Sequence, residues 1–201
     1  EVTLLEKSSQ VLSKVKVSGG GRCNVTHDCD EVSELIKAYP RGKHFLRKAF
    51  SHFGPHDTRE WFTSRGVPLK TESDGRVFPV SNQSQDIIDC LRKEADRYAV
   101  RVEFLAAVAD LQKKDQEWQL TLTDGRIITA TAGCLACGGF HKLSAYDWLS
   151  RIGHTIVPPV PSLFTFNLPH HPISGLMGVS LPEVRLRILD CDQEEKGPLL
   201  I

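Results

Sequence analysis

The alternation of apolar and polar residues along the chain predicts short strands separated by amphipathic helices. Residues 2–6 are rich in β-forming side chains and end on an acid, which is typical of a strand. Apolar residues recur at helical spacing over 43–53 and 57–65, and these segments are punctuated by Gly54-Pro55 and Gly66. The first third of the chain is therefore predicted to combine a strand with two helices.

A third helix, which we expect Ser84 to cap, leads into a β-rich segment. Asp124-Gly125 lies between two apolar runs and suits a type I′ hairpin turn. The strands predicted here are 100–104, 107–112, 118–123, 126–130 and 133–137, the last of them buried and ending at Gly138-Gly139.

The last quarter of the chain changes character. A short helix is predicted over 144–152, with Ser144 and Asp147 at capping-box spacing. Three prolines at 158, 159 and 161 then mark a boundary, beyond which 163–168 and 184–189 are predicted strands. Strands that alternate with helices indicate an α/β nucleotide-binding domain over 1–160, followed by the beginning of a β-rich domain over 161–201.

Composition narrows the class of protein. The 25 basic and 25 acidic residues balance, so we expect no general nucleic-acid or anionic-membrane binder. A 40% apolar content excludes a disordered chain, and no run reaches the roughly 18 apolar residues of a membrane span. We expect no secretory signal, because Glu1 is followed by neither a charged n-region nor an apolar h-region. Because the chain begins and ends within apolar runs, we expect it to be an internal segment of a longer protein.

The six cysteines are too few and too irregularly spaced for a disulfide scaffold, so the chain suits a reducing, cytoplasmic compartment, or a plastid if the source is a plant. Cys134 and Cys137 form a single C-x-x-C, which leaves a redox dithiol or half a zinc site as alternatives. Their apolar surroundings favour buried, structural cysteines, and we predict no metal site.

The segment Ser18-Gly19-Gly20-Gly21-Arg22-Cys23-Asn24 carries the clearest chemical signal. Consecutive glycines let backbone N–H groups approach an anion without interference from Cβ atoms. Arg22 adds a planar, always charged donor, while Ser18 and Asn24 can bond a heterocycle or a sugar hydroxyl. Glu6-Lys7 stands where dinucleotide-binding folds place the acid that holds a ribose hydroxyl. A flexible loop and a solvated acid are the alternatives.

The chain also resembles a known family. Its motifs are matched in order along the chain. The matches are the run from Lys14 to Thr26 and the segments 69–72, 74–81, 137–139, 153–156, 159–163 and 175–180. This is the HI0933-like flavoprotein family, which includes aminoacetone oxidase-like and BaiN-type bile-acid reductases. The resemblance implies a three-layer Rossmann-like domain that binds FAD and is interrupted by a β-barrel domain.

The resemblance also implies which residues would bind the cofactor. Glu6 would hold the adenosine ribose, and Val108 would touch adenine through its backbone. The glycine loop would lie along the pyrophosphate and isoalloxazine, with 78–81 near the flavin. The complete implied set is Glu6, Lys7, Ser18, Gly19, Gly20, Gly21, Arg22, Cys23, Asn24, Phe78, Pro79, Val108, Cys137, Gly138 and Gly139.

Two departures from the family pattern affect this set. The glycine fingerprint of the first βα turn is not in the chain, so we expect the 201 residues alone to bind FAD weakly or not at all. Residues 140–152 also lack the Gly-Ser-Thr-Gly-Asp-Gly loop that family members usually have.

The expected function is flavin-mediated redox of a small molecule, such as an amine or an unsaturated carbonyl, with NAD(P)H as a candidate donor. No catalytic base is identified, because His44, His52 and His56 fit surface positions better. The alternative hypotheses are a degenerate nucleotide-fold protein that acts as a binding module, and a thiol-redox or zinc protein. We expect no nucleic-acid or membrane partner, and the sequence does not specify the oligomeric state.

Overall fold

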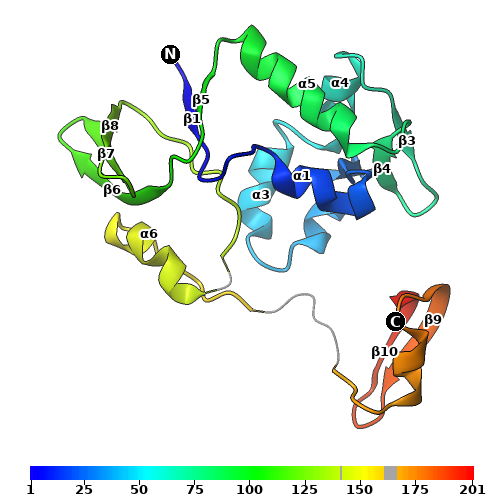
Figure 1. Cartoon of the computed structure of the whole chain (residues 1–201). Coiled ribbons are helices and arrows are strands. Elements are labelled where there is room, and N and C mark those ends of the chain that lie inside the picture. Colours follow the sequence, from blue (N-terminus) through cyan, green and yellow to red (C-terminus); the bar gives the residue numbers. More distant parts are fainter. Residues whose placement is uncertain (141, 161–166) are drawn as a thin grey trace. The chain divides into compact units, whose positions relative to one another are not determined.

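The structure is a computed structural model that describes residues 1–140, 142–160 and 167–201 (Figure 1). It is a mixed α/β protein, as predicted, with one parallel and three antiparallel strand groupings in the described residues. The chain divides into two compact units. The first holds residues 1–138 and 148–154, and the second holds 139–147 and 155–201. The predicted division at residue 160 stays a prediction.

Two strands far apart in sequence form the parallel pair. β1 (Thr3–Leu5) lies beside β5 (Arg101–Glu103), with Leu4 opposite Val102. The pairing continues past β1, because the Glu6 amide donates to the Glu103 carbonyl at 2.9 Å. Parallel neighbours need a long crossover, and here the crossover carries the first unit's helices.

Five α-helices of the first unit precede β5. They are α1 (Ser13–Val17), α2 (Val32–Leu35), α3 (Lys43–Phe50), α4 (Pro55–Thr63) and α5 (Ser84–Arg97). The apolar sides of α1, α4 and α5 meet in a common core. Phe62, Val67 and Ile87 form the core together with the thiols of Cys23 and Cys90. The helices predicted over 43–53, over 57–65 and from residue 84 are confirmed.

The start of α5 differs from the prediction. Gln83, and not Ser84, occupies the N-cap position, and Ser84 is the first helical residue. The Ser84 hydroxyl instead donates to the Lys16 carbonyl at 2.8 Å. This side chain therefore ties α5 to the end of α1, which packs alongside it (Figure 1).

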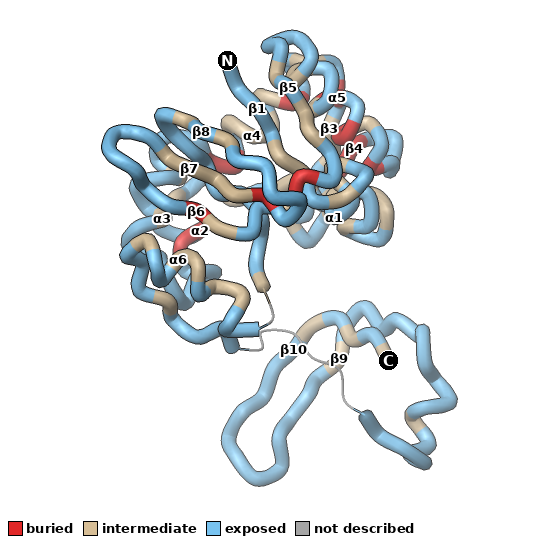
Figure 2. The backbone as a smooth tube through the Cα atoms, turned by 60° about the vertical axis from the view of Figure 1, so that its left-hand side comes forward, coloured by how far each residue is buried: buried red, intermediate tan, exposed pale blue. Residues whose placement is uncertain are grey.

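A small antiparallel sheet has β4 (Arg76–Pro79) at its centre, between β2 (Thr26–His27) and β3 (Leu69–Thr71). Val77, Phe78 and Pro79 of β4 are fully buried. Figure 2 shows the buried residues of the first unit gathered along β4 and α5, among other places. The buried side chains of β4 therefore form a fixed base for the residues that pack on this strand.

The predicted hairpin forms, but with a different turn. β6 (Val108–Lys114), β7 (Glu117–Leu122) and β8 (Ile127–Ala130) make an antiparallel meander. A type I′ turn needs positive φ at both central residues, whereas Gly125 has φ +86° and Asp124 is not in that region. The Gly125 amide donates to the Leu122 carbonyl at 3.0 Å, which places Gly125 after a tight turn. The Asp124 carboxylate favours this form by accepting from the Arg126 amide and Nε.

The buried strand predicted over 133–137 is wrong. This segment has no regular structure, and Cys134 and Cys137 are exposed. A strand needs a neighbour to pair its backbone groups, and none of the described strands lies in register with this segment. The capping box is also wrong, because Ser144 lies inside the short 3-10 helix Leu143–Tyr146 that precedes α6 (Asp147–Arg151).

The second unit contains one antiparallel hairpin, β9 (Ser180–Ile188) with β10 (Gln193–Leu200), which confirms the strand predicted over 184–189. Most residues of this hairpin are exposed (Figure 2). The described part of the unit holds no closed barrel. The strand predicted over 163–168 lies mainly outside the described residues.

Candidate cofactor site

The glycine loop that follows α1 has a backbone that only glycine adopts without strain. Gly19, Gly20 and Gly21 have φ values of +56°, +67° and +84°, all in the left-handed region. The loop is closed by a hydrogen bond of 3.0 Å from the Cys23 amide to the Ser18 carbonyl. The run of glycines predicted as a ligand-binding loop is therefore a tight, hydrogen-bonded turn.

The three glycines differ in what surrounds them. A Cβ atom on Gly19 would lie 2.8 Å from the Asn24 amide nitrogen and 3.0 Å from a ring carbon of Phe78. A Cβ atom on Gly20 or Gly21 would meet nothing within 4 Å. Gly19 thus packs inward on the protein, while Gly20 and Gly21 leave an open backbone face that a ligand can approach.

Arg22 is held in place by two neighbours. Its Nη1 lies 2.6 Å from Oε1 of Glu72, and its guanidinium lies 3.9 Å from the centre of the buried Phe78 ring. Arg76 approaches the same ring at 5.4 Å and the same carboxylate at 3.5 Å. A cation over an aromatic face is stabilised by the ring quadrupole, so Phe78 and Glu72 together fix the guanidinium beside the loop.

The other residues of the loop have separate roles. The Cys23 side chain is buried in the core, so only its backbone faces the loop. The Ser18 hydroxyl donates to the Val15 carbonyl at 2.9 Å and helps end α1. Asn24 is exposed. Pro79, predicted to lie near the flavin, is fully buried beside Phe78 and supports the loop from within the sheet.

Glu6 lies at the end of β1, as predicted. Its Oε1 accepts 2.8 Å hydrogen bonds from the amide and the hydroxyl of Ser8. These bonds, the amide first, hold the pKa of the Glu6 carboxyl below its ordinary value, because they stabilise the charged form. Lys7 next to it is exposed. Glu6 is therefore an anchored carboxylate at a strand tip.

The structure brings the segment before β6 to the same strand tip. The Ala106 amide donates to the Glu6 carbonyl at 2.9 Å, and the Leu105 amide donates to the Ser8 carbonyl at 3.1 Å. Val108, two residues further on, begins β6 with an exposed side chain. The implied adenosine residues Glu6 and Val108 thus belong to segments that are hydrogen-bonded together.

Gly138 lies close to the side chain of Lys14, which belongs to α1. A Cβ atom at this position would lie 2.7 Å from Nζ of Lys14, and Gly138 has φ +73°. Cys137 precedes it and is exposed, and Gly139 belongs to the second unit. The sequence arguments missed Lys14 and Glu72 as neighbours of the site, although both lie inside the segments that resemble the family.

These features fit a phosphate-bearing dinucleotide. Gly20 and Gly21 offer backbone without side chains, Arg22 has N–H donors beyond its bond to Glu72, and Glu6 offers a carboxylate for hydroxyl groups. The described residues contain no group of three or more His, Cys, Asp or Glu side chains placed to hold a metal ion. None of the described helices has the length and apolar character needed to cross a bilayer.

Comparison with known proteins identifies the family of the fold. Residues 1–196 match the model of the family described as "HI0933-like protein Rossmann domain". The predicted Rossmann-type fold class is thereby confirmed.

Three curated relatives cover most of the chain. It is 28% identical over 185 residues to 3-dehydro-bile acid delta(4,6)-reductase of Clostridium scindens, covering 89% of this chain and 44% of that protein. It is 24% identical to the ribosomal RNA dihydrouridine synthase of Haemophilus influenzae over 90% of this chain and 47% of that protein. The corresponding Escherichia coli synthase is 26% identical, over 91% and 47%. The chain thus spans less than half the length of these relatives.

Proposed function

The chain belongs to the HI0933-like Rossmann-domain family, and on this premise we propose that the protein carrying it is an FAD-dependent oxidoreductase. The observation that carries the proposal is the left-handed triple-glycine loop, open above Gly20 and Gly21 and flanked by the fixed guanidinium of Arg22. Membership of an FAD-binding family and a reductase among the relatives support it, and they do not favour the non-catalytic binding module.

Each part of the site would have a separate task. The Glu6 carboxylate would bind the ribose hydroxyls. The segment that leads to Val108 is hydrogen-bonded to the backbone of Glu6 and Ser8. The amides of Gly20 and Gly21 and the Arg22 guanidinium would bind the negatively charged part of the cofactor. Phe78 and Glu72 would keep the guanidinium oriented so that no rotamer search is needed on binding. FAD supplies the two-electron transfer itself when bound.

We propose reduction of a carbon–carbon double bond conjugated to a carbonyl as the reaction class. The names of the relatives describe such reductions, one in a bile acid and the other in the uridine of ribosomal RNA. The step adds two electrons and two protons across the bond, and a donor of the NAD(P)H class would supply the electrons. We assign no acid–base residue to the proton transfer.

The relatives bear on two expectations, the partner and the location of the protein. Neutral net charge predicted no nucleic-acid partner, but a relative named for ribosomal RNA leaves RNA open as a substrate, beside a small molecule. A cytoplasmic location stays a prediction, and nothing supports a plastid, since the three relatives are bacterial.

The test is flavin binding by the protein that carries this chain, with an arginine pair as matched variants. Arg22 and Arg76 share Glu72 and the Phe78 ring, but only Arg22 stands on the glycine loop. We expect the wild type to show visible flavin absorbance, Arg22→Ala to weaken FAD binding about tenfold or more, and Arg76→Ala to weaken it less than about threefold.

Two results would contradict the proposal. One is a wild-type protein that is colourless as purified and does not quench the fluorescence of added FAD. The other is an Arg22→Ala variant that binds FAD as the wild type does. If both arginine variants lose FAD affinity equally, with unchanged far-UV circular dichroism, the site would lie on the β3–β4 hairpin and not on the glycine loop.

A further inference from the structure

The balanced charge of the chain conceals one strongly basic segment. Residues 36–53 contain no aspartate or glutamate. They contain five lysines and arginines, Lys37, Arg41, Lys43, Arg47 and Lys48. Because the Debye length is about 8 Å at physiological ionic strength, a ligand senses this local charge and not the sum over the chain. The segment therefore has the electrostatics of a basic protein.

The fold gathers part of this charge into a hollow between α2 and α3. The hollow has a volume of about 380 Å³, and we call it the basic pocket. Cations from both sides point to it, together with a tyrosine ring and a serine hydroxyl. Its lining residues are Ser33, Ile36, Lys37, Tyr39, Pro40, Lys43, His44 and Arg47.

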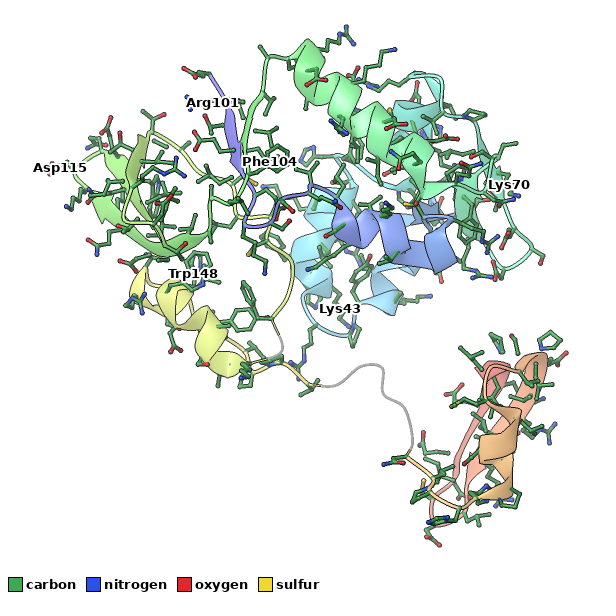
Figure 3. The ribbon with its side chains drawn as sticks, in the orientation of Figure 1. Lys43, Lys70, Arg101, Phe104, Asp115 and Trp148 are labelled. Atoms are coloured by element: carbon green, nitrogen blue, oxygen red, sulfur yellow. The ribbon has the colours of Figure 1, made fainter. Side chains whose placement is uncertain are left out.

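The cations of α3 have no partner among the residues that the structure describes. In the described part of the chain, Lys43, Arg47 and Lys48 form no ion pair and no side-chain hydrogen bond, and all three are exposed. Lys37, at the other side of the basic pocket, is bonded to Glu34 at 2.6 Å. Figure 3 shows Lys43 at the beginning of α3. Several cations on one helix that are not neutralised by nearby carboxylates give a positive surface potential, which attracts an anionic ligand.

One aromatic ring lines the basic pocket together with these cations. It belongs to Tyr39, which is 38% exposed and whose ring centre lies 5.5 Å from that of Phe50. Exposed rings beside cations are what single-stranded nucleic acid uses, because bases stack on the rings while the phosphates meet the charges.

We propose that the basic pocket of α2 and α3 binds the phosphodiester backbone of RNA. Lys43 and Arg47, one helical turn apart, would contact successive phosphates, and the partly exposed Tyr39 ring of the same pocket would stack on a base. An anionic membrane fits less well, since insertion needs a free apolar face, whereas Leu46 and Phe50 of α3 are half-buried. The inference deepens the proposed function by naming the partner's class, but RNA binding is measurable without flavin or turnover.

The experiment is fluorescence anisotropy of a labelled, uridine-containing RNA hairpin with the protein that carries this chain, titrated at several salt concentrations. The test variant is Lys43→Gln/Arg47→Gln. Its control is Lys93→Gln/Arg97→Gln, which removes the same charge at the same spacing from the exposed cations of α5. We expect about fivefold weaker binding by the test variant, and a salt slope smaller by about 1.4 for two lost phosphate contacts. The control should bind as the wild type does.

A charge-preserving variant, Lys43→Arg/Arg47→Lys, should keep near-wild-type affinity and separates lost contacts from lost folding. The inference is overturned if the wild type does not bind the hairpin, if the test variant binds as well as the wild type, or if both glutamine variants lose affinity equally. It is also overturned if vesicles rich in phosphatidylserine bind and RNA does not. Loss of RNA binding with flavin binding intact would leave the proposed FAD function standing.

Discussion

The glycine loop and the basic pocket both present arginine and open space, yet the chain builds them in opposite ways. At the loop, the Arg22 guanidinium is fixed by Glu72 at 2.6 Å and by the Phe78 ring at 3.9 Å. At the basic pocket, Arg47 and Lys43 have no partner among the described residues and extend into solvent. The loop is a preorganised site whose residues also stabilise the fold. The cations of the basic pocket, in contrast, are exposed and contribute little to the stability of the fold.

This difference teaches how to separate stability from binding. Where a binding residue is packed and paired, its replacement lowers both the free energy of unfolding and the affinity. Where it is exposed and unpaired, only affinity should change. The free energy of unfolding and the pKa of a site carboxylate are therefore the quantities that distinguish the two regions.

The largest effect is expected within the glycine loop itself. Gly19→Ala should lower the free energy of unfolding by about 3 kcal/mol, because the new Cβ adds a backbone clash at 2.8 Å to the left-handed strain. Gly20→Ala should lower it by only about 1 kcal/mol, since its Cβ enters open space and only the strain remains. Urea unfolding of both variants measures the difference. Equal losses would show that the loop is not packed on Phe78.

A smaller effect is expected at Glu6. Its carboxyl pKa lies below the ordinary value in the folded state, so the stabilisation is present above the unfolded pKa and is lost as pH falls through the folded pKa. Ser8→Ala removes the hydroxyl bond but keeps the amide bond. We therefore expect the pKa to rise towards, but not reach, the ordinary value, and the acid-induced loss of stability to become shallower.

Carboxyl-carbon NMR titration of Glu6 measures this shift. Ser9→Ala is the matched control, because Ser9 is exposed and makes none of the hydrogen bonds to Glu6. A Glu6 pKa that does not move in Ser8→Ala would mean that the hydroxyl does not support the carboxylate.

The smallest change in stability is expected at the basic pocket. Lys43→Gln/Arg47→Gln should alter the free energy of unfolding by less than about 0.5 kcal/mol, because the side chains are exposed and unpaired in the described structure. Thermal unfolding at matched ionic strength measures it. A loss comparable to that of Gly19→Ala would show that these side chains also stabilise the fold. Weaker RNA binding by this variant could then not be assigned to lost phosphate contacts.

Local patterns predicted the helices and most strands, because those elements follow from periodicity and from Gly and Pro positions. They also located the glycine loop and Glu6, whose residue types carry their chemistry with them. Neighbours that come together only in the fold were not predictable. Glu72 meets Arg22 across 50 positions, and Lys14 meets Gly138 across more than a hundred.

The wrong strand has a physical cause, and the expectation about nucleic acid stays open for a related reason. Segment 133–137 is apolar enough for a buried strand, but strand formation depends on a partner, which composition does not supply. The nucleic-acid expectation relied on the total charge, whereas electrostatic recognition depends on where charges lie. Residues 36–53 show this directly, since their excess of cations is cancelled only by acids elsewhere in the chain.

The turn that joins β3 to β4 has a consequence for the order in which the site assembles. The Gly75 amide bonds to the Glu72 carbonyl at 2.9 Å, and the Asp74 carboxylate bonds to the Arg76 Nε at 2.7 Å. All these contacts join residues within five positions, and hairpins of this kind close in about 1–10 μs. We expect the hairpin to place Glu72 beside Phe78 early in folding, as a local platform. Arg22 and the glycines, some fifty residues earlier, would then dock on it, so that the cofactor loop is among the last parts to become ordered.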